Sequence, residues 1–272
     1  MLKIRVLTAL VIGLLTFMVI FLLPPWAFRL AVAILWLTGS WEFTRLAGLG
    51  RISRWLLFGF QLILIGLMMR HWNAIAGHAL TFLTAAGLTW CVMFLRLVTF
   101  RPGVGPGINY RLVSFFCALA GISFAWFALA WLRAQADGEF LILLLIFIIW
   151  AADTGAYFTG SLLGKHKLAP SISPGKTLEG LFGGVLLAVL IALLVSRLTL
   201  ATPPEPAPLI ILTVGTVLAA AAGDLFISLH KRVMSLKDTG RIFPGHGGAL
   251  DRFDSLLTGA PFFALGILML SS

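Results

Sequence analysis

The sequence predicts an all-α, polytopic integral membrane protein with about nine transmembrane helices. Three observations favour this fold class: 60% of the 272 residues are hydrophobic, only 11% are charged, and the mean hydropathy is +1.03. Soluble domains carry roughly 25% charged residues and about 45–50% apolar ones. The composition therefore excludes an ordinary soluble domain, and it excludes a disordered chain because disordered chains are poor in apolar residues.

Long apolar segments follow one another along the chain, and each is interpreted as a membrane-spanning helix. A helix needs roughly 20 mostly apolar residues to cross about 30 Å of hydrocarbon. A closed β-barrel is disfavoured because the runs are long and do not alternate in steps of two. The predicted spans, of which the second and third are short, are Val6–Leu23, Trp26–Gly39, Trp55–Met69, Ala79–Leu95, Leu112–Trp131, Phe140–Phe158, Leu178–Leu198, Leu209–Leu229 and Ser255–Leu270.

The first span is expected to be retained and not cleaved as a signal peptide. Lys3 and Arg5 precede the apolar run, as they would in a signal peptide. The run is long, however, and it is followed by Pro24, Pro25 and Trp26, where a cleavage site would need small residues.

Lysine and arginine sort the predicted loops into two groups. Sixteen of the 20 basic side chains fall on the side of the N-terminus, and only Arg29, Arg70, Arg133 and Arg197 fall on the other. Cytoplasmic loops of membrane proteins are enriched in lysine and arginine. The N-terminus is therefore predicted in the cytoplasm and the C-terminus outside. The net charge of +10 is explained by this topology and by anionic lipid, so no nucleic-acid partner is expected.

Polar residues concentrate in two predicted cytoplasmic stretches, residues 153–180 and 223–254. The segment 136–272 is therefore expected to carry the functional site on the cytoplasmic face, and the segment 1–135 to serve as a scaffold of five spans. Six of the ten acidic residues lie in the two stretches, namely Asp153, Glu179, Asp224, Asp238, Asp251 and Asp254.

Three of these acids point to a metal site. Asp251 and Asp254 are three residues apart at the expected start of the last helix, which places both on one helix face. Helix capping alone could explain part of their presence. Asp224, near the cytoplasmic end of the eighth span, could reach them, although it could also lie at the interface or pair with a lysine. Ligands that offer only oxygen suit Mg²⁺ and do not suit zinc.

Glycines and cations next to these acids point to a polyphosphate substrate. The run Gly245-His246-Gly247-Gly248 precedes the last helix and lets backbone N–H groups approach an anion. Ser173-Pro-Gly-Lys-Thr177 is not a P-loop, because Pro170 stands where that motif needs glycine. Lys176 is instead expected to face a phosphate from the start of a helix that is capped. The basic side chains around the glycine run are Lys231, Arg232, Lys237, Arg241 and Arg252.

Other chemistry is disfavoured by what the sequence lacks. No nucleophile and base stand together, so a protease or esterase is not expected. Cys91 and Cys117 both lie in apolar runs, so neither a disulfide framework nor a thiolate metal site is expected.

Two blocks of the sequence resemble the family of CDP-diacylglycerol synthases, also called phosphatidate cytidylyltransferases. They cover about a fifth of the chain. His230 and Ala249 depart from the family pattern at positions that we interpret as packing positions. The matching motifs are Asp153-Thr-x-Ala-Tyr157, Ser173-Pro-x-Lys-Thr-x-Glu-Gly180, Ser228-x-x-Lys231-Arg232, Lys237-Asp238 and Pro244-Gly-His-Gly-Gly-x-x-Asp251-Arg252-x-Asp254.

The resemblance implies that CTP and phosphatidic acid react to give CDP-diacylglycerol and pyrophosphate with Mg²⁺, and it implies a homodimer. Asp224 and Asp251 are expected to bind the metal, with Asp254 as a further ligand or as a residue that orients them. Asp224 and Asp251, together with Lys231 and Arg252, form the expected catalytic set. Phosphate contacts are expected from Lys231, Arg232, Lys237, Arg252, Lys176 and Ser173, close backbone approach from Gly247 and Gly248, a loop or nucleotide contact from His246, and an orienting role from Asp153.

Three other functions stay open from the sequence. A transporter would also contain intramembrane acids, but here the polar residues crowd one side and no repeat is visible. A CTP-dependent polyprenol kinase would share a nucleotide site but release CDP. A degenerate relative could bind lipid without turnover, although the complete acidic set argues against it.

Overall fold

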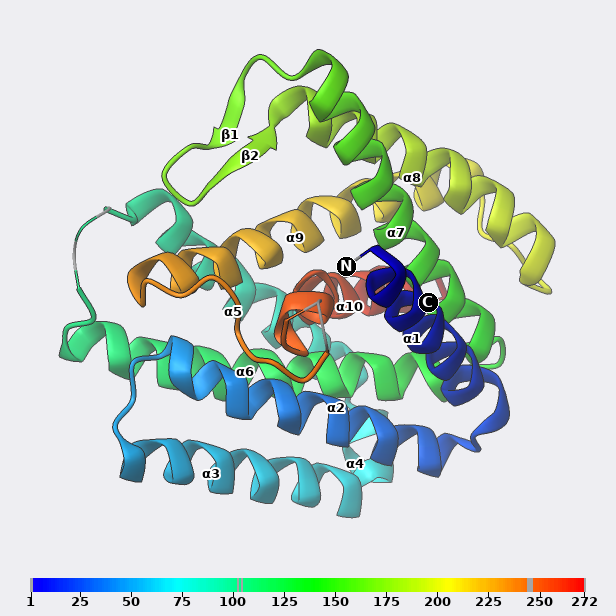
Figure 1. Cartoon of the computed structure of the whole chain (residues 1–272). Coiled ribbons are helices and arrows are strands. Elements are labelled where there is room, and N and C mark those ends of the chain that lie inside the picture. The colour runs from blue at the N-terminus through cyan, green and yellow to red at the C-terminus, as the bar shows by residue number, and fades with distance from the viewer. Residues whose placement is uncertain (1, 102, 104, 244–246, 272) are drawn as a thin grey trace.

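The computed structural model describes residues 2–101, 103, 105–243 and 247–271, and nearly all of its regular structure is helical. Ten helices and one two-stranded sheet lie within these residues (Figure 1). In chain order the elements are α1 (Leu2–Leu22), α2 (Pro25–Leu46), α3 (Arg51–Arg70), α4 (Trp72–Gly77), α5 (Ala79–Thr99), α6 (Ile108–Arg133), α7 (Gly138–Leu163), β1 (Lys167–Ala169), β2 (Ser173–Thr177), α8 (Leu178–Thr199), α9 (Pro206–Val233) and α10 (Leu250–Ser271).

The helix boundaries follow from local chemistry. Pro25 and Pro206 occupy the first positions of α2 and α9, where a missing backbone N–H costs nothing. Thr177 caps α8, because its hydroxyl accepts a hydrogen bond from the N–H of Gly180 at 3.1 Å. The capped helix start expected after Lys176 is therefore confirmed.

Each of the nine predicted spans overlaps one long helix, and the structure confirms a polytopic, largely helical membrane protein, whereas the count of nine spans, which includes α1 and α2, stays a prediction. Within α1, the apolar stretch Leu10–Leu22 is shorter than a full membrane span. The helices that are long and apolar enough to cross a membrane number seven within the described residues, namely α3, α5, α6, α7, α8, α9 and α10.

One element contradicts the expectation of a purely helical chain. β1 and β2 form an antiparallel pair in which Lys167 faces Thr177 and Ala169 faces Ser173. These strands could not be predicted because they are three and five residues long and show no alternation of apolar and polar residues. In Figure 1 this hairpin projects at the upper left, between α7 and α8.

The helices differ in how deeply they are buried. The apolar windows of α6 and α7 are 61% and 56% buried inside the protein, whereas those of α3 and α8 are each 22% buried. Since hydrocarbon is as apolar as a protein core, the outward faces of α3 and α8 suit contact with lipid. One continuous hydrophobic core takes residues from α1 through α10, so the segments 1–135 and 136–272 pack together.

Glycines bring α7 and α8 unusually close. A Cβ atom at Gly155 of α7 would lie 2.6 Å from the carbonyl oxygen of Gly183, and one at Gly184 would lie 2.6 Å from that of Ala152. Small residues allow such contact between helices in a membrane. The two helices are therefore packed backbone to backbone beneath the hairpin that joins them.

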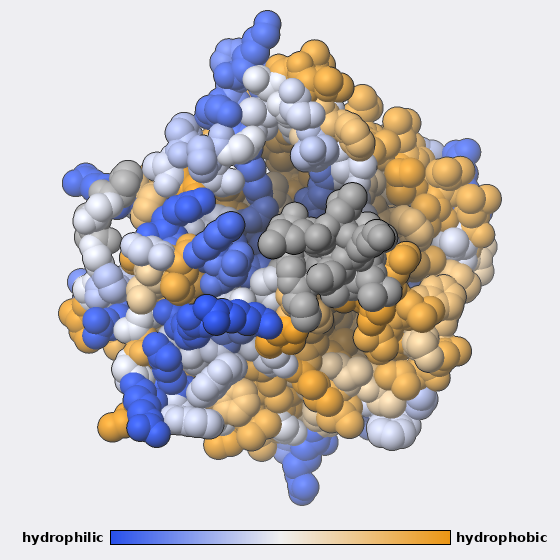
Figure 2. All heavy atoms as spheres, in the orientation of Figure 1, coloured by the Kyte–Doolittle hydropathy of each residue, from blue (hydrophilic) through white to orange (hydrophobic). Residues whose placement is uncertain are grey.

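The connections between the helices divide into two groups at opposite ends of the bundle. In Figure 1 the connections after α2, α5 and α9 lie toward the left, and those after α6 and α8 lie toward the right. This is the grouping that the distribution of basic residues predicts. Figure 2 shows the same division on the surface, where hydrophilic residues gather on the left of the view and apolar residues cover much of the right.

Candidate active site

A polar cavity of about 600 Å³ lies among α1, α7, α9 and α10. Hydrophobic residues of α1 and α7, among them Ile12, Ile146 and Trp150, form its apolar wall. The cavity gathers acids and bases that are up to about 100 residues apart in sequence. Its polar lining consists of Asp153, Asp224, Lys231, Asp238, Asp251, Arg252, Asp254 and Ser255.

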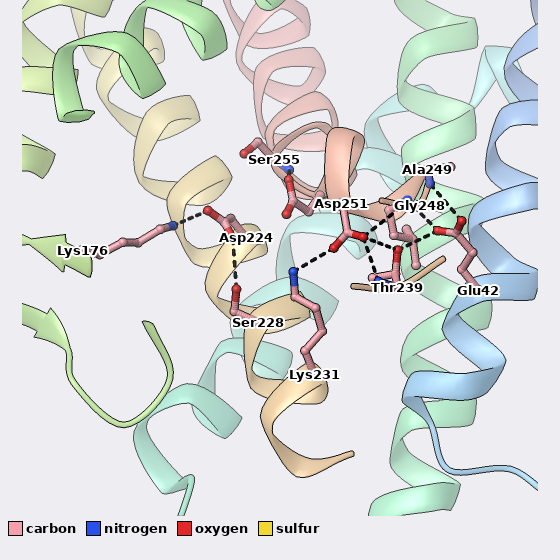
Figure 3. A network of polar contacts seen from close by, with 12 residues as sticks. Glu42, Lys176, Asp224, Ser228, Lys231, Thr239, Gly248, Ala249, Asp251 and Ser255 are labelled. Atoms are coloured by element: carbon pink, nitrogen blue, oxygen red, sulfur yellow. Dashed lines mark hydrogen bonds and ion pairs between the residues drawn. The ribbon is translucent and has the colours of Figure 1, made fainter. Parts of the chain in front are cut away.

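Asp251, in the first turn of α10, is the most tightly held of these acids (Figure 3). Its Oδ1 accepts a hydrogen bond from Lys231 Nζ at 2.8 Å. Its Oδ2 accepts from the N–H of Thr239 at 2.8 Å, the hydroxyl of Thr239 at 3.0 Å and the N–H of Gly248 at 3.0 Å. The side chain is only 6% exposed, so Asp251 fixes the α9–α10 loop and holds Lys231 at the cavity.

The glycines before α10 allow this close packing. Gly247 has a φ of +83°, and a Cβ atom there would lie 2.6 Å from Asp251 Oδ2. Gly248 is buried, and a Cβ atom there would collide with Thr239 and with both carboxylate oxygens of Glu42. The N–H of Gly248 donates to Asp251, and the expected approach of this glycine to the substrate stays a prediction.

On the opposite side of the cavity, Asp224 of α9 pairs with Lys176 of β2. Asp224 Oδ2 lies 2.6 Å from Lys176 Nζ, and Asp224 Oδ1 accepts a 3.2 Å hydrogen bond from Ser228. Both side chains of the ion pair are 28% exposed. Asp224 lines the first cavity, whereas Lys176 lines a second cavity of about 480 Å³ under the hairpin, together with Ser173 and Asp153. The pair therefore stands between two adjoining cavities.

The hairpin that carries Lys176 is fastened at both ends. Arg232 of α9 donates from Nε to the carbonyl oxygen of Ile172 at 2.9 Å, which holds the β1–β2 turn. Glu179 of α8 accepts hydrogen bonds from the N–H groups of Lys165 at 3.1 Å and His166 at 3.2 Å, which hold the chain before β1. Arg232, expected at a phosphate, thus positions the hairpin.

The remaining predicted site residues fall into three groups. Asp254, Arg252 and Asp153 line the main cavity, as expected for residues of the site. Lys237 is exposed and is not among the residues that line that cavity. His246 lies outside the described residues. His230 and Ala249 are buried at 0% and 3% exposure, which confirms that both are packing positions.

The carboxylates fit Mg²⁺ by their chemistry, although they are not assembled into a ready site. Within the described residues, no three Asp, Glu, His or Cys side chains lie close enough together to hold a metal ion. Asp153, Asp224 and Asp254 nevertheless line one cavity. Mg²⁺ is usually bound by one or two carboxylates plus water and substrate phosphates, and this donor set meets that need. Asp251 fits least well because both its oxygens already accept hydrogen bonds.

An apolar groove of about 210 Å³ adjoins the polar cavity between α1, α2 and α10. The two hollows share Ile12, Thr16, Ile146, Phe253 and Leu256. An amphiphilic molecule could thus place its polar part against the acids and bases and its apolar part in the groove.

Two residues of this region could not be recognised from sequence. Glu42 of α2 and Thr239 of the α9–α10 loop are 3% and 0% exposed and are hydrogen-bonded to each other at 2.8 Å. They are 197 residues apart, so no local spacing links them. The one available sign was that Glu42 is an acidic residue directly after a predicted apolar span.

The chain is similar to known proteins over nearly its whole length. Residues 3–270 match the model of the cytidylyltransferase family. The phosphatidate cytidylyltransferase of Haemophilus influenzae is 33% identical, over 97% of this chain and 98% of its own length. That of Pseudomonas aeruginosa is 33% identical over 97% and 96%, and that of Bacillus subtilis is 46% identical over 42% of each chain.

Proposed function

Because the chain belongs to the cytidylyltransferase family, we propose that this nucleotidyltransferase joins CTP and phosphatidic acid to give CDP-diacylglycerol and pyrophosphate. The observation that carries the proposal is the polar cavity, lined by two cations and five acids, beside an apolar groove. One substrate is a water-soluble polyphosphate and the other is a membrane lipid. A polar cavity that adjoins an apolar groove suits both.

The reaction needs charge compensation more than it needs a base. A phosphate oxygen of phosphatidate attacks the α-phosphorus of CTP, and the bond from that phosphorus to the bridging oxygen of the β-phosphate breaks. Pyrophosphate leaves with the electron pair. The attacking oxygen is already anionic at neutral pH, so no proton has to be removed first. The barrier comes from bringing an anion to a polyanion, which fixed cations lower.

The chain supplies these cations from separate elements. Lys231 is held at the cavity by Asp251, and Arg252 lines the cavity from the first turn of α10. Lys176 reaches it from the hairpin. We assign Lys231 and Arg252 to the phosphates at the reacting centre and Lys176 to a phosphate that displaces it from Asp224. Lysines act here as point charges, and arginine can also bind in a bidentate manner.

We also propose that Asp224 and Asp254 bind Mg²⁺, with Asp153 close by and Asp251 as an orienting residue. When bound, the ion would screen the phosphate charges and favour in-line geometry. The oxygen-only donor set of the cavity supports this assignment.

The finer topology is also proposed. We place all nine long helices across a bacterial inner membrane, with the N-terminus and the cavity on the cytoplasmic side, where CTP is found, and the C-terminus outside. The sixteen basic residues on the side of the N-terminus support this orientation. A homodimer remains an expectation from the family.

The test is turnover by the purified protein in detergent with phosphatidic acid, CTP and Mg²⁺. Stoichiometric pyrophosphate and CDP-diacylglycerol that disappear with EDTA are expected. Release of CDP without a CDP-lipid would replace the proposal with a CTP-dependent lipid kinase. A folded protein that turns over no nucleotide would contradict both reactions and favour a transporter or a binding protein.

A further inference from the structure

The site has a buried carboxylate that does not line the cavity. Glu42 lies on α2, in the segment that the sequence assigned to the scaffold, and is 3% exposed. Its Oε1 accepts a hydrogen bond from the N–H of Ala249 at 2.9 Å. Its Oε2 accepts from the N–H of Leu250 at 2.9 Å and from the hydroxyl of Thr239 at 2.8 Å. The partners in α10 are 207 and 208 residues away in sequence.

These contacts complete the capping of α10. The first N–H groups of a helix have no partner within the helix and must be satisfied by other groups. Here three consecutive N–H groups are taken by two carboxylates: Gly248 donates to Asp251, and Ala249 and Leu250 donate to Glu42. The helix that carries Asp251, Arg252 and Asp254 is therefore fixed at its start by α2. A negative charge at this position is also favoured by the helix dipole.

Thr239 joins the two carboxylates directly. Its hydroxyl lies 2.8 Å from Glu42 Oε2 and 3.0 Å from Asp251 Oδ2. A hydroxyl carries one hydrogen, so it donates to one of these oxygens at a time. Asp251 in turn holds Lys231. A continuous chain of contacts thus leads from Glu42 through Thr239 and Asp251 to a cation at the cavity (Figure 3).

Two glycines leave the room that the Glu42 carboxylate occupies. A Cβ atom at Gly240 would collide with the Glu42 carboxylate, and one at Gly248 would collide with it as well. Glycine is therefore required on both sides of the carboxylate for it to reach α10. In Figure 3, Glu42 projects from α2 toward Ala249, Gly248 and Thr239, on the far side of Asp251 from Lys231.

We propose that Glu42 is a positioning residue of the active site, which holds the start of α10 and the Asp251–Lys231 pair in place for the transfer reaction. It acts through Thr239 and α10 and does not itself touch the substrate. The effect on the reaction rests on the proposed function, whereas the effect on α10 does not.

The decisive variant is Glu42→Gln, which keeps the shape and removes the charge. Each oxygen of Glu42 accepts from a backbone N–H. Whichever way the new amide is turned, its NH₂ group therefore faces a donor. A displacement at a reacting site can reduce the rate by about 100-fold. We expect kcat per folded molecule to fall at least about tenfold, with KM for CTP changed less than about threefold, which is the pattern of lost transition-state stabilisation.

Gln61→Leu is the matched control for a purely structural effect. Gln61 is fully buried on α3 and donates to Ser123 on α6 at 2.9 Å, remote in the chain from the site residues. This variant should lower thermal stability and leave kcat per folded molecule unchanged. Equal losses of kcat in Glu42→Gln and Gln61→Leu would overturn the proposal.

Thr239 provides a second variant in case Glu42→Gln does not fold. Thr239→Val keeps the shape without the hydroxyl and should also lower kcat, whereas Thr239→Ser should restore it. Combined with Glu42→Gln, Thr239→Val should cost less than the sum of the two single losses, because both variants remove the contact that joins Glu42 to Asp251 through Thr239. Full additivity, or an active Thr239→Val, would contradict the coupling.

Backbone hydrogen exchange over residues 247–253 gives a readout that needs no substrate. Exchange should be faster in Glu42→Gln than in the wild type, and unchanged in Gln61→Leu. Unchanged exchange in Glu42→Gln overturns the proposal. If the wild type makes no CDP-diacylglycerol but exchange responds as expected, the proposed function fails and the fixing of α10 by Glu42 stands.

Discussion

The two sides of the polar cavity present the same kind of ion pair in different settings. On the α10 side, Asp251 and Lys231 are 6% and 16% exposed, and three further donors hold the carboxylate. On the hairpin side, Asp224 and Lys176 are both 28% exposed, and Ser228 is the one further donor described. The first pair is set in a network of buried contacts, and the second is bordered by cavities on two sides.

The difference matters because exposure decides how easily an ion pair exchanges partners. Exposed pairs contribute about 0–1 kcal/mol, whereas removing one member of a buried pair costs about 3–5 kcal/mol. The Asp224–Lys176 pair can therefore separate when phosphates or a metal ion arrive. The Asp251–Lys231 pair keeps its geometry, so Lys231 stays in the same position when substrate binds.

Removal of the divalent metal should have the largest effect on turnover. It should affect the Asp224 side of the cavity and leave the contacts of Asp251 intact. With EDTA, formation of CDP-diacylglycerol is expected to stop, because the Mg²⁺ that we propose at Asp224 and Asp254 would no longer be there to screen the phosphates. The melting temperature should change little, since the contacts of Asp251 need no metal. A large loss of thermal stability with EDTA would show that the ion also holds the buried side together.

Asp251→Asn should cause the second largest loss of turnover, because it disrupts the buried Asp251–Lys231 ion pair. The amide cannot accept from Lys231 and from the three donors at Oδ2 together. Turnover is expected to fall by about 100-fold or more, while the protein still folds and inserts into the membrane. Activity near that of the wild type, measured by release of pyrophosphate, would exclude a central role for Asp251.

Lys176→Met should have a smaller effect, because the pair it breaks is partly exposed. A drop in kcat/KM of about tenfold is expected from the loss of one phosphate contact. The same substitution at Lys231 should cost more, since it also leaves Asp251 without its charged partner. If the two lysine variants lost equal activity, the two sides of the cavity would be equivalent in function.

Thr177→Ala should have the smallest effect, on stability and not on chemistry. It removes the 3.1 Å hydrogen bond that caps α8, and such a loss costs about 1 kcal/mol. Thr38→Ala, in which the lost hydroxyl bonds Ile34 of its own helix, should change stability less. Comparison of the two melting temperatures isolates the contribution of the cap.

Much of the fold and part of the site could be predicted, because hydropathy and residue spacing depend only on residues that are close in sequence. Hydropathy places each long helix, and the spacing of Asp251 and Asp254 places both near the start of α10, with Asp251 in its first turn. The hairpin could not be predicted, because its strands pair only with each other over a few residues. Arg232 was expected at a phosphate because its charge is visible in sequence, whereas its bond to Ile172 depends on a fold contact between residues 60 apart.

Glu42 also bears on how the protein is made. A chain is synthesised at about 5–20 residues per second, so α2 is finished about 10–40 s before Thr239, Ala249 and Leu250 exist. During that interval the carboxylate lacks every partner that it has in the folded protein. An unpaired charge is costly within hydrocarbon, so α2 must wait with Glu42 near water or against another polar group. The partners of Glu42 are thus supplied late, and a late segment of this sequence completes the packing of an early one.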